Sequence, residues 1–139
     1  MIVESYCSFD VSKLLKEKGF DEEIETLIRP DETRYYLDQN SVSRMSHSTI
    51  RNSNINIYSD DVSCPTHQMA IKWLREVHKI HITVGYTFKA DANLADNYVS
   101  YCFEIENAKT LFYYARDEWY NTYEEACEVA IKYCLTELL

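Results

Sequence analysis

The chain has 139 residues, 46% of them apolar, which is the size and composition of one ordinary globular domain. Its formal charge of −9 repels phosphate at long range and argues against direct binding to nucleic acid. No apolar run is long enough to span a membrane, and the start MIVESYCSFD lacks the basic head and apolar stretch of a secretory signal. The five cysteines are scattered without a Cys-x-x-Cys pair, so we expect reduced thiols in the cytoplasm.

The first 62 residues are predicted to form a small and irregular part of the chain. The segment SFDVSKLLKEKG has the pattern of a short helix, with Val11, Leu14 and Leu15 directed inward and Gly19 at its end. The segment IETLIRPDETRYYL is predicted to be a hairpin that turns near Pro30. The sequence therefore predicts a helix followed by a hairpin in this part.

Two groups of polar residues near the end of this part are candidate catalytic sites. Ser46–Ser48 (SHS) places a histidine beside serines, but sequence neighbours rarely form a triad, and the polar segment 40–54 is predicted to be a long loop. INIYS, residues 55–59, is expected to add a short strand. Asp60 and Asp61 could act as a carboxylate pair, although adjacent acids just before a helix more often serve its positive end. We expect this structural role.

The stretch CPTHQMAIKWLREVHKIH, residues 64–81, contains one cysteine and three histidines and resembles a zinc site when read by spacing alone. Its apolar residues instead follow the stripe of an amphipathic helix over about 65–78. His67 and His78 would then lie about 16 Å apart along the axis, too far to bind one ion. We predict no metal site here, and expect His78 and His81 to mark the helix end, where a partly charged imidazole suits the helix dipole.

The predicted helix has a defined face and a defined start. Ser63 or Cys64 can serve as its N-cap, and Pro65 suits the first turn, where a missing N–H has no consequence. The apolar residues expected to face inward are Met69, Ala70, Trp73, Leu74 and Val77.

Three segments with alternating apolar and polar residues follow the helix: IHITVGYTFK (80–89), YVSYCFEIE (98–106) and LFYYAR (111–116). A polar connector (90–97) and the turn NAKT separate them. Such clean alternation predicts half-buried strands in an antiparallel sheet with helices on one side. The side chains of the first segment expected to face one way are Ile80, Ile82, Val84, Tyr86 and Phe88.

The C-terminal segment carries the strongest helix signal in the chain. Thr122 followed by Glu125 is a capping box, and an apolar stripe at helical spacing follows it. Cys127 and Cys134 lie on that stripe about 10 Å apart along the axis, so they are predicted to fill the core and not to form a disulfide. The stripe comprises Ala126, Cys127, Ala130, Ile131, Cys134, Leu135 and Leu138.

Together these elements predict an α+β protein with a small N-terminal subdomain (1–62) and an α-β-β-β-α module (63–139). The module has the element order of double-stranded-RNA-binding domains, whose second helix opens with lysines that contact phosphate. Glu124, Glu125 and Glu128 occupy the corresponding positions here. The reversed charge predicts that RNA binding is absent, whatever the topology.

Two stretches of the module, CPTHQMAIKWLREVHKIHI and YNTYEEACEVAIKYCLTELL, resemble a group of small uncharacterised proteins encoded by phages, prophages and mobile elements of gut bacteria. The resemblance covers the two helices and the first strand. It implies an origin in a mobile element, and it implies no activity.

Tyrosine is abundant, with 12 residues, and it crowds the stretch that contains Tyr113, Tyr114, Trp119 and Tyr120. Tyrosine is enriched where proteins meet, so these four residues form a candidate interaction surface. With two glycines the chain has no glycine-rich phosphate loop, and no catalytic, cofactor-binding or metal-binding residues are assigned. We expect a non-catalytic accessory protein that acts through protein–protein contact. The alternatives are an acidic nucleic-acid mimic that inhibits a host DNA-binding protein, and an enzyme whose site the sequence does not reveal.

Overall fold

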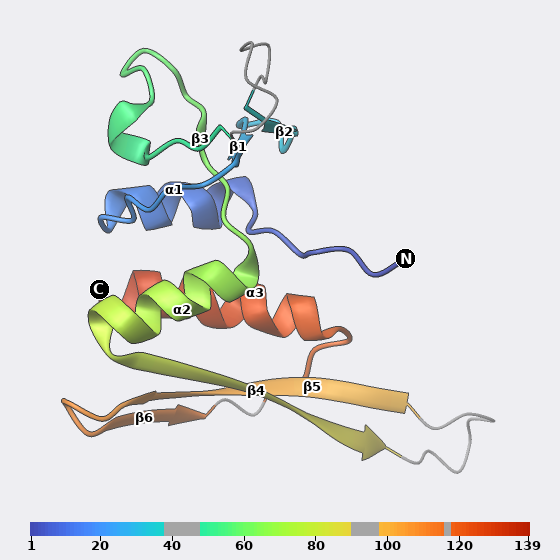
Figure 1. Ribbon diagram of the computed structural model, residues 1–139. Helices are drawn as coiled ribbons and strands as arrows, with labels where there is room; N and C mark the ends of the chain where they lie inside the picture. Colours follow the sequence, from blue (N-terminus) through green and yellow to red (C-terminus); the bar gives the residue numbers. More distant parts are fainter. Residues whose placement is uncertain (38–47, 90–97, 116–117) are drawn as a thin grey trace. The chain divides into compact units, whose positions relative to one another are not determined.

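A computed structural model describes residues 1–37, 48–89, 98–115 and 118–139 of the chain (Figure 1). They form two compact units, Met1–Ala70 with Leu139, and Ile71–Leu138. Each unit contains a three-stranded antiparallel sheet and helix, which confirms the predicted α+β class. The described part of the chain contains no helix with both the length and the apolar composition needed to cross a membrane.

The first helix, α1 (Phe9–Glu17), forms as predicted, because its cap and its end signal are both satisfied. The Ser8 side chain accepts a hydrogen bond from the backbone N–H of Val11 at 3.2 Å. Gly19 follows the helix with φ of +96°, a left-handed conformation that glycine adopts without strain. Val11 and Leu15 are buried, whereas Leu14 is half-buried.

The hairpin of the first unit also forms as predicted. Strands β1 (Thr26–Ile28) and β2 (Arg34–Tyr36) pair in antiparallel register, with Pro30 in the turn between them. A third strand, β3 (Val62–Ser63), pairs with the other edge of β1 and completes a sheet of order β2-β1-β3. Asn52 secures β3, because its side chain donates to the Phe20 carbonyl at 2.8 Å and accepts from Ser63 N–H at 3.0 Å.

The strand predicted at 55–59 is wrong. Its place is taken by a short 3-10 helix, η1 (Asn52–Asn54), and a turn, in which Asn56 accepts a hydrogen bond from the Tyr58 N–H at 2.9 Å. Ile57 and Tyr58 are exposed, so the apolar residues of INIYS have no sheet to face. The local Asn side chain offers the backbone a turn, and this competes with strand pairing.

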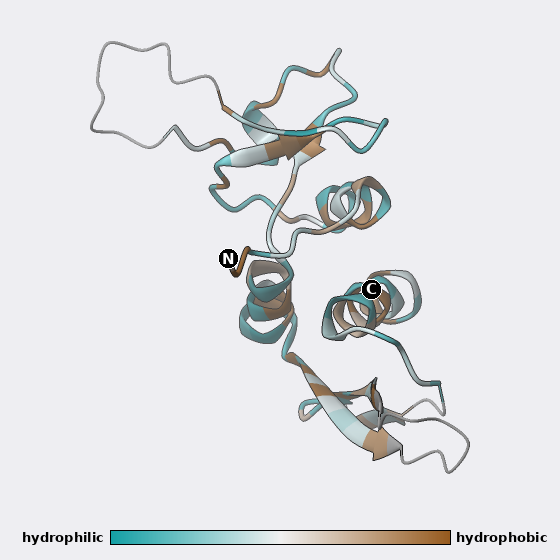
Figure 2. Cartoon of the chain, turned by 90° about the vertical axis from the view of Figure 1, so that its right-hand side faces the viewer, coloured by the Kyte–Doolittle hydropathy of each residue, from teal (hydrophilic) through white to brown (hydrophobic). Residues whose placement is uncertain are grey.

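The second unit contains the predicted order of strands and C-terminal helix. Strands β4 (Ile80–Lys89), β5 (Tyr98–Asn107) and β6 (Phe112–Ala115) form an antiparallel sheet of order β4-β5-β6. Helices α2 (His67–His78) and α3 (Tyr123–Tyr133) lie on one side of this sheet (Figure 1). In Figure 2, strand β4 carries apolar (brown) colour toward its start and at its tip, with paler bands between them.

Helix α2 begins later than predicted and presents a different face. Thr66 is the capping residue, because its hydroxyl accepts a hydrogen bond from the Met69 N–H at 3.2 Å, so Ser63 and Cys64 are not the cap. Met69 and Val77 were expected to face inward but are exposed. The buried residues of the helix are His67, Ala70, Ile71, Trp73 and Leu74.

Helix α3 begins at the predicted N-cap residue, because the Thr122 side chain accepts from the Glu125 N–H at 3.1 Å, which is one half of the predicted capping box. The predicted stripe is buried from Ala126 to Leu135, and Leu138 is half-buried. The helix continues into a π-helical turn, η2 (Cys134–Leu138), in which the Thr136 hydroxyl donates to the Lys132 carbonyl at 2.9 Å. All five cysteines of the chain are free thiols.

Candidate functional site

Two of the four aromatic residues proposed as an interaction surface belong to a stack of rings inside the second unit. Tyr114 stacks on Tyr133 with ring centroids 4.2 Å apart and on Phe103 at 6.4 Å. Tyr120 stacks on the same Phe103 at 6.0 Å, and its hydroxyl donates to the Glu118 carboxylate at 3.2 Å. The faces of these rings are therefore engaged within the unit.

The other two residues of that set, Tyr113 and Trp119, are exposed by 58% and 44%. Tyr113 lies opposite Glu106 in the β5–β6 register, on the polar face of the sheet. Partial desolvation, followed by the nearby Glu104 carboxylate, raises the pKa of Tyr113. The four residues thus divide between the interior of the unit and its surface.

A second group of aromatic residues, which the sequence did not single out, lies at the far end of the β4–β5 hairpin. Tyr86 and Phe88 are exposed by 65% and 68%, and their rings meet edge to face with centroids 5.8 Å apart. Tyr86 pairs across the sheet with Tyr101, whose ring contacts that of Tyr123 at 6.2 Å. We define the distal aromatic surface as Tyr86, Phe88, Val99, Tyr101 and Tyr123.

This surface is exposed because the strands are longer than the helices. Strand β4 has 10 residues and spans about 33 Å, whereas α3 has 11 residues and spans about 16 Å. Ile80, Phe103 and Ile105 are buried, while Tyr86 and Phe88 on the same face of the sheet are not. Tyr86 and Phe88 thus share one face with Ile80, as the alternation predicted, but the helices do not cover them. The alternation of residues shows which side chains share a face. Whether the helices reach far enough to cover that face depends on the relative lengths of strand and helix.

The outer edge of β4 adds backbone groups to this region. Among the described residues, β4 pairs with β5 alone. The sequence of β4, IHITVGYTFK, contains no proline and no acidic residue, although the chain has 23 acidic residues. Edge strands are normally protected by proline, charge or a covering segment, because their unpaired N–H and C=O groups accept another strand. The edge of β4 has few of these protections in its sequence.

The histidines of the suspected zinc stretch are separated by the helix, as predicted. His67 and His78 are the first and last residues of α2. Within the described ranges, no three of Cys64, His67, His78 and His81 bring their ligand atoms together. Cys64 donates its thiol hydrogen bond to the Cys7 carbonyl at 3.3 Å.

His78 differs from the expectation of a charged helix end. Its ring packs edge to face on Trp73 with centroids 4.6 Å apart, and burial lowers the pKa of the imidazole. The lowered pKa favours the neutral ring. Lys79 serves the helix end instead, with φ of 60° and its ammonium donating to the Glu76 carbonyl at 2.8 Å.

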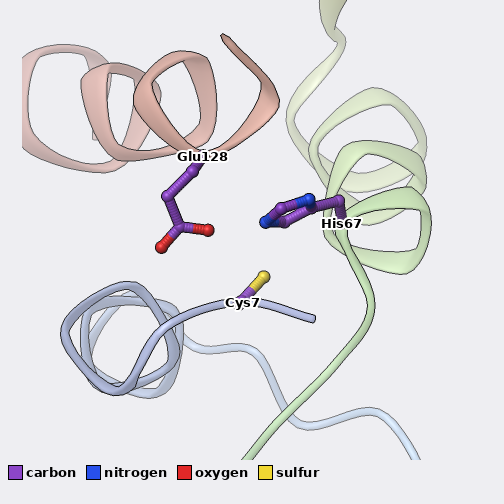
Figure 3. A group of neighbouring side chains, drawn as sticks. All are labelled: Cys7, His67 and Glu128. Atoms are coloured by element: carbon purple, nitrogen blue, oxygen red, sulfur yellow. The ribbon is translucent and has the colours of Figure 1, made fainter. Parts of the chain in front are cut away.

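A buried thiol and a buried imidazole lie close together in the first unit, where sequence spacing gave no signal. Cys7 and His67 place a sulfur and a ring nitrogen within 4.8 Å of one another (Figure 3). Glu128, also labelled there, belongs to the second unit. A structural zinc site uses four ligands, and no further Cys, His, Asp or Glu of the described first unit joins this pair. The pair alone is not a metal site.

The acidic pair Asp60 and Asp61 is separated into two roles. The Asp61 carboxylate accepts a hydrogen bond from the Tyr35 hydroxyl, and burial followed by this bond raises the pKa of Tyr35. Asp60 is exposed and lines a groove. Both residues precede β3 and not a helix, so the expected role at a helix end is wrong. Ser46 and His47 lie outside the described residues.

Comparison with known proteins adds no family. No protein-family model, no curated protein and no solved structure matches this chain.

Proposed function

We propose that this chain is a non-catalytic accessory protein that acts through protein–protein contact, made by the distal aromatic surface and the outer edge of β4. The observation that carries the proposal is the exposure of Tyr86 and Phe88 beside an edge with no strand paired to it among the described residues. Exposed aromatic side chains on a rigid strand provide large contact area at low entropic cost. An unpaired edge supplies backbone hydrogen bonds to a strand of the partner.

The charge of the chain favours this edge over the rest of the surface. Two molecules of charge −9 repel each other, so a contact between copies is best formed where acidic residues are absent. Residues 80–89 meet this condition. We therefore propose a second copy of the chain as the first partner.

A symmetric contact between two β4 strands is geometrically consistent. In an antiparallel pairing centred on Val84, Ile80 lies opposite Phe88 and Ile82 lies opposite Tyr86. All these apolar side chains stay on one face, because the pairing joins residues of the same parity. Such an arrangement closes as a two-fold dimer, in which the β4-β5-β6 sheets of the two copies join into one sheet of six strands.

The proposal includes an origin in a phage, prophage or other mobile element, which is supported by the resemblance of the stretches at 64–82 and 120–139. It places the protein in the cytoplasm, because scattered free thiols suit a reducing compartment. It includes no nucleic-acid ligand, since the opening turn of α3 is acidic at Glu124 and Glu125.

The test measures the molar mass of the full chain by light scattering over a range of concentrations. Phe88→Ser is expected to weaken self-association by about tenfold or more, as truncation of a central aromatic residue does at other interfaces. Tyr113→Ser is the matched control, because Tyr113 is similarly exposed but lies on the opposite face of the sheet.

A chain that is monomeric at all concentrations would remove the second copy as the partner. The same two variants then serve in affinity capture from the host, where a protein retained by wild type and by Tyr113→Ser but lost with Phe88→Ser supports the surface. A protein that is lost with Tyr113→Ser but retained with Phe88→Ser would show that the partner binds the opposite face of the sheet, and this would contradict the proposed surface. A monomer that retains no protein through either residue overturns the proposal.

A further inference from the structure

The first unit contains an open groove of about 530 Å³, which is within the size range of small-molecule sites. One wall is α1, and the other walls are the hairpin turn and the segment that leads into β3. The groove belongs to the first unit, and the distal aromatic surface belongs to the second. The lining residues that give it chemical character are Phe9, Lys13, Lys16, Glu17, Asp60 and Val62.

The charged groups of the groove are balanced, in contrast to the acidic chain. Lys13 and Lys16 are one turn apart on the same face of α1, and Glu17 and Asp60 contribute one carboxylate each. In the part of the chain that the structure describes, none of these four side chains forms an ion pair or a hydrogen bond with another residue. Two lysines and two acidic residues therefore line one groove, and none of the four is engaged in an ion pair within the described residues.

The floor of the groove is apolar and part of the core. Val62 is buried in a cluster with Ile28 and Cys64, and Phe9 packs against that cluster. An apolar group of a ligand would thus contact a surface that is already formed, with little ordering of side chains on binding.

The wall formed by the hairpin turn is anchored to α1. The backbone N–H of Phe9 donates to both carboxylate oxygens of Glu32, at 3.3 and 3.1 Å. Glu32 has φ of 70°, a conformation that residues other than glycine rarely adopt. A negative side chain at the helix N-terminus is favourable, so the contact fixes the turn and its Pro30 against the start of α1.

The wall that carries Asp60 is anchored on both sides of this residue. Ser59 donates its backbone N–H to the Asn56 carbonyl at 2.9 Å, and Asp61 donates its backbone N–H to the Ser59 hydroxyl at 3.1 Å. The Asp61 side chain is held by Tyr35. Asp60 therefore presents its carboxylate from a turn whose backbone is held on each side.

From these features we infer that the groove binds a small zwitterion with an apolar segment, such as an amino acid or a short peptide with free ends. The ligand carboxylate contacts the Lys13 and Lys16 ammonium groups, and the ligand ammonium contacts Asp60 and Glu17. The apolar segment lies on Phe9 and Val62. A polyanion is disfavoured by the two carboxylates, and a polycation by the two lysines.

The experiment titrates the full ¹⁵N-labelled chain with the tripeptide Ala-Leu-Ala, its N-acetylated form, its C-terminal amide and free leucine, and follows backbone amide shifts. The free tripeptide is expected to saturate the shifts of residues in α1 and around Asp60. Each blocked form is expected to bind about tenfold more weakly, since each loses one charge-assisted contact. Tighter binding of the tripeptide than of leucine identifies a peptide ligand, and the reverse order identifies an amino acid.

Three variants identify the groups involved. The double variant Lys13→Gln and Lys16→Gln is expected to weaken the tripeptide about tenfold and to make the C-terminal amide bind as well as the acid. Asp60→Asn is expected to weaken the tripeptide about tenfold and to make the N-acetylated form bind as well as the free tripeptide. Lys18→Gln, at the C-cap of the same helix, is the matched control and is expected to bind as wild type.

Three results would each overturn the inference. The first is that neither the tripeptide nor leucine gives saturable shifts, and the second is that the free and blocked peptides bind with equal affinity. The third is that Lys18→Gln loses as much affinity for the tripeptide as the double lysine variant does. As a control for folding, the amide spectrum of each variant without ligand is compared with that of the wild type, and a matching spectrum shows that the first unit is folded. Because the oligomeric state is measured separately, failure here leaves the protein-contact proposal untouched.

Discussion

The two glycines of the chain give opposite predictions when each is replaced by alanine. Gly85 lies in β4 with ordinary strand backbone, and an added Cβ would meet the Cys102 sulfur at 4.0 Å, a normal contact distance. Gly85→Ala is therefore expected to raise the free energy of unfolding by about 0.4–1 kcal/mol, because alanine restricts the unfolded chain.

Gly19 has open space around the position of a Cβ, since no heavy atom lies within 4 Å, but its φ is +96°. A left-handed conformation disfavours alanine by about 1–2 kcal/mol, and the unfolded-state gain offsets about 0.4–1 kcal/mol of this. Gly19→Ala is thus expected to lower the free energy of unfolding by about 1 kcal/mol. Gly19→Asn should lower it less, because asparagine tolerates this conformation.

The assay is equilibrium unfolding in urea, followed by tryptophan fluorescence and by far-ultraviolet circular dichroism. Both tryptophans, Trp73 and Trp119, belong to the second unit, so fluorescence reports the effect of Gly85→Ala directly. Circular dichroism includes the first unit and reports Gly19→Ala. If available space decided the outcome, Gly19→Ala would be tolerated as well as Gly85→Ala, because neither added Cβ meets a close neighbour. That result would refute the reasoning from backbone conformation.

Three further predictions concern the second unit. In the same urea assay, Thr122→Ala is expected to lower the free energy of unfolding by about 1 kcal/mol, because the Glu125 N–H loses its hydrogen-bond acceptor. Thr122→Ser should keep most of the wild-type stability, because serine retains the hydroxyl. Burial lowers the pKa of His78 from its ordinary 6.5, so the stability it contributes is present above pH 6.5 and lost as the pH falls through the folded-state pKa. His78→Gln should therefore lose less stability than wild type on moving from about pH 7.5 to 5, and an equal loss would contradict this sign. Burial raises the pKa of the Cys127 thiol to about 11 and that of the Cys134 thiol to about 12. Both thiols should therefore resist a thiol reagent at about pH 8 until urea unfolds the chain. Prompt labelling of either thiol in the native protein would refute their burial.

Local signals in the sequence predicted most elements of the second unit. The Thr122 N-cap and the alternation of residues 80–89 depend on neighbouring residues only, and both appear in the structure. The third predicted strand (111–116) is confirmed over Phe112–Ala115, whereas Leu111 has φ of 58° and lies in the turn, and Arg116 lies outside the described residues. Such features can be read from the chain because propensity, capping and pattern agree.

Features that depend on distant partners could not be read in this way. Strand β3 has two residues, too few for a pattern, and exists because β1 offers its second edge. The groove combines α1 with Asp60, which is more than forty residues later in the chain. The exposure of Tyr86 and Phe88 depends on where the helices end, which alternation does not contain. These sites arise from packing between elements, so neighbouring residues do not predict them.

The contact between Glu32 and the start of α1 has a consequence for how the first unit acquires its structure. Helix α1 has nine residues, and isolated helices of this length are marginal in water. One of its terminal N–H groups is satisfied by a side chain that follows 23 residues later, in a turn held in an unfavourable conformation. The helix and the hairpin are therefore expected to become ordered in one cooperative step, and a fragment that ends before the hairpin should contain little stable helix.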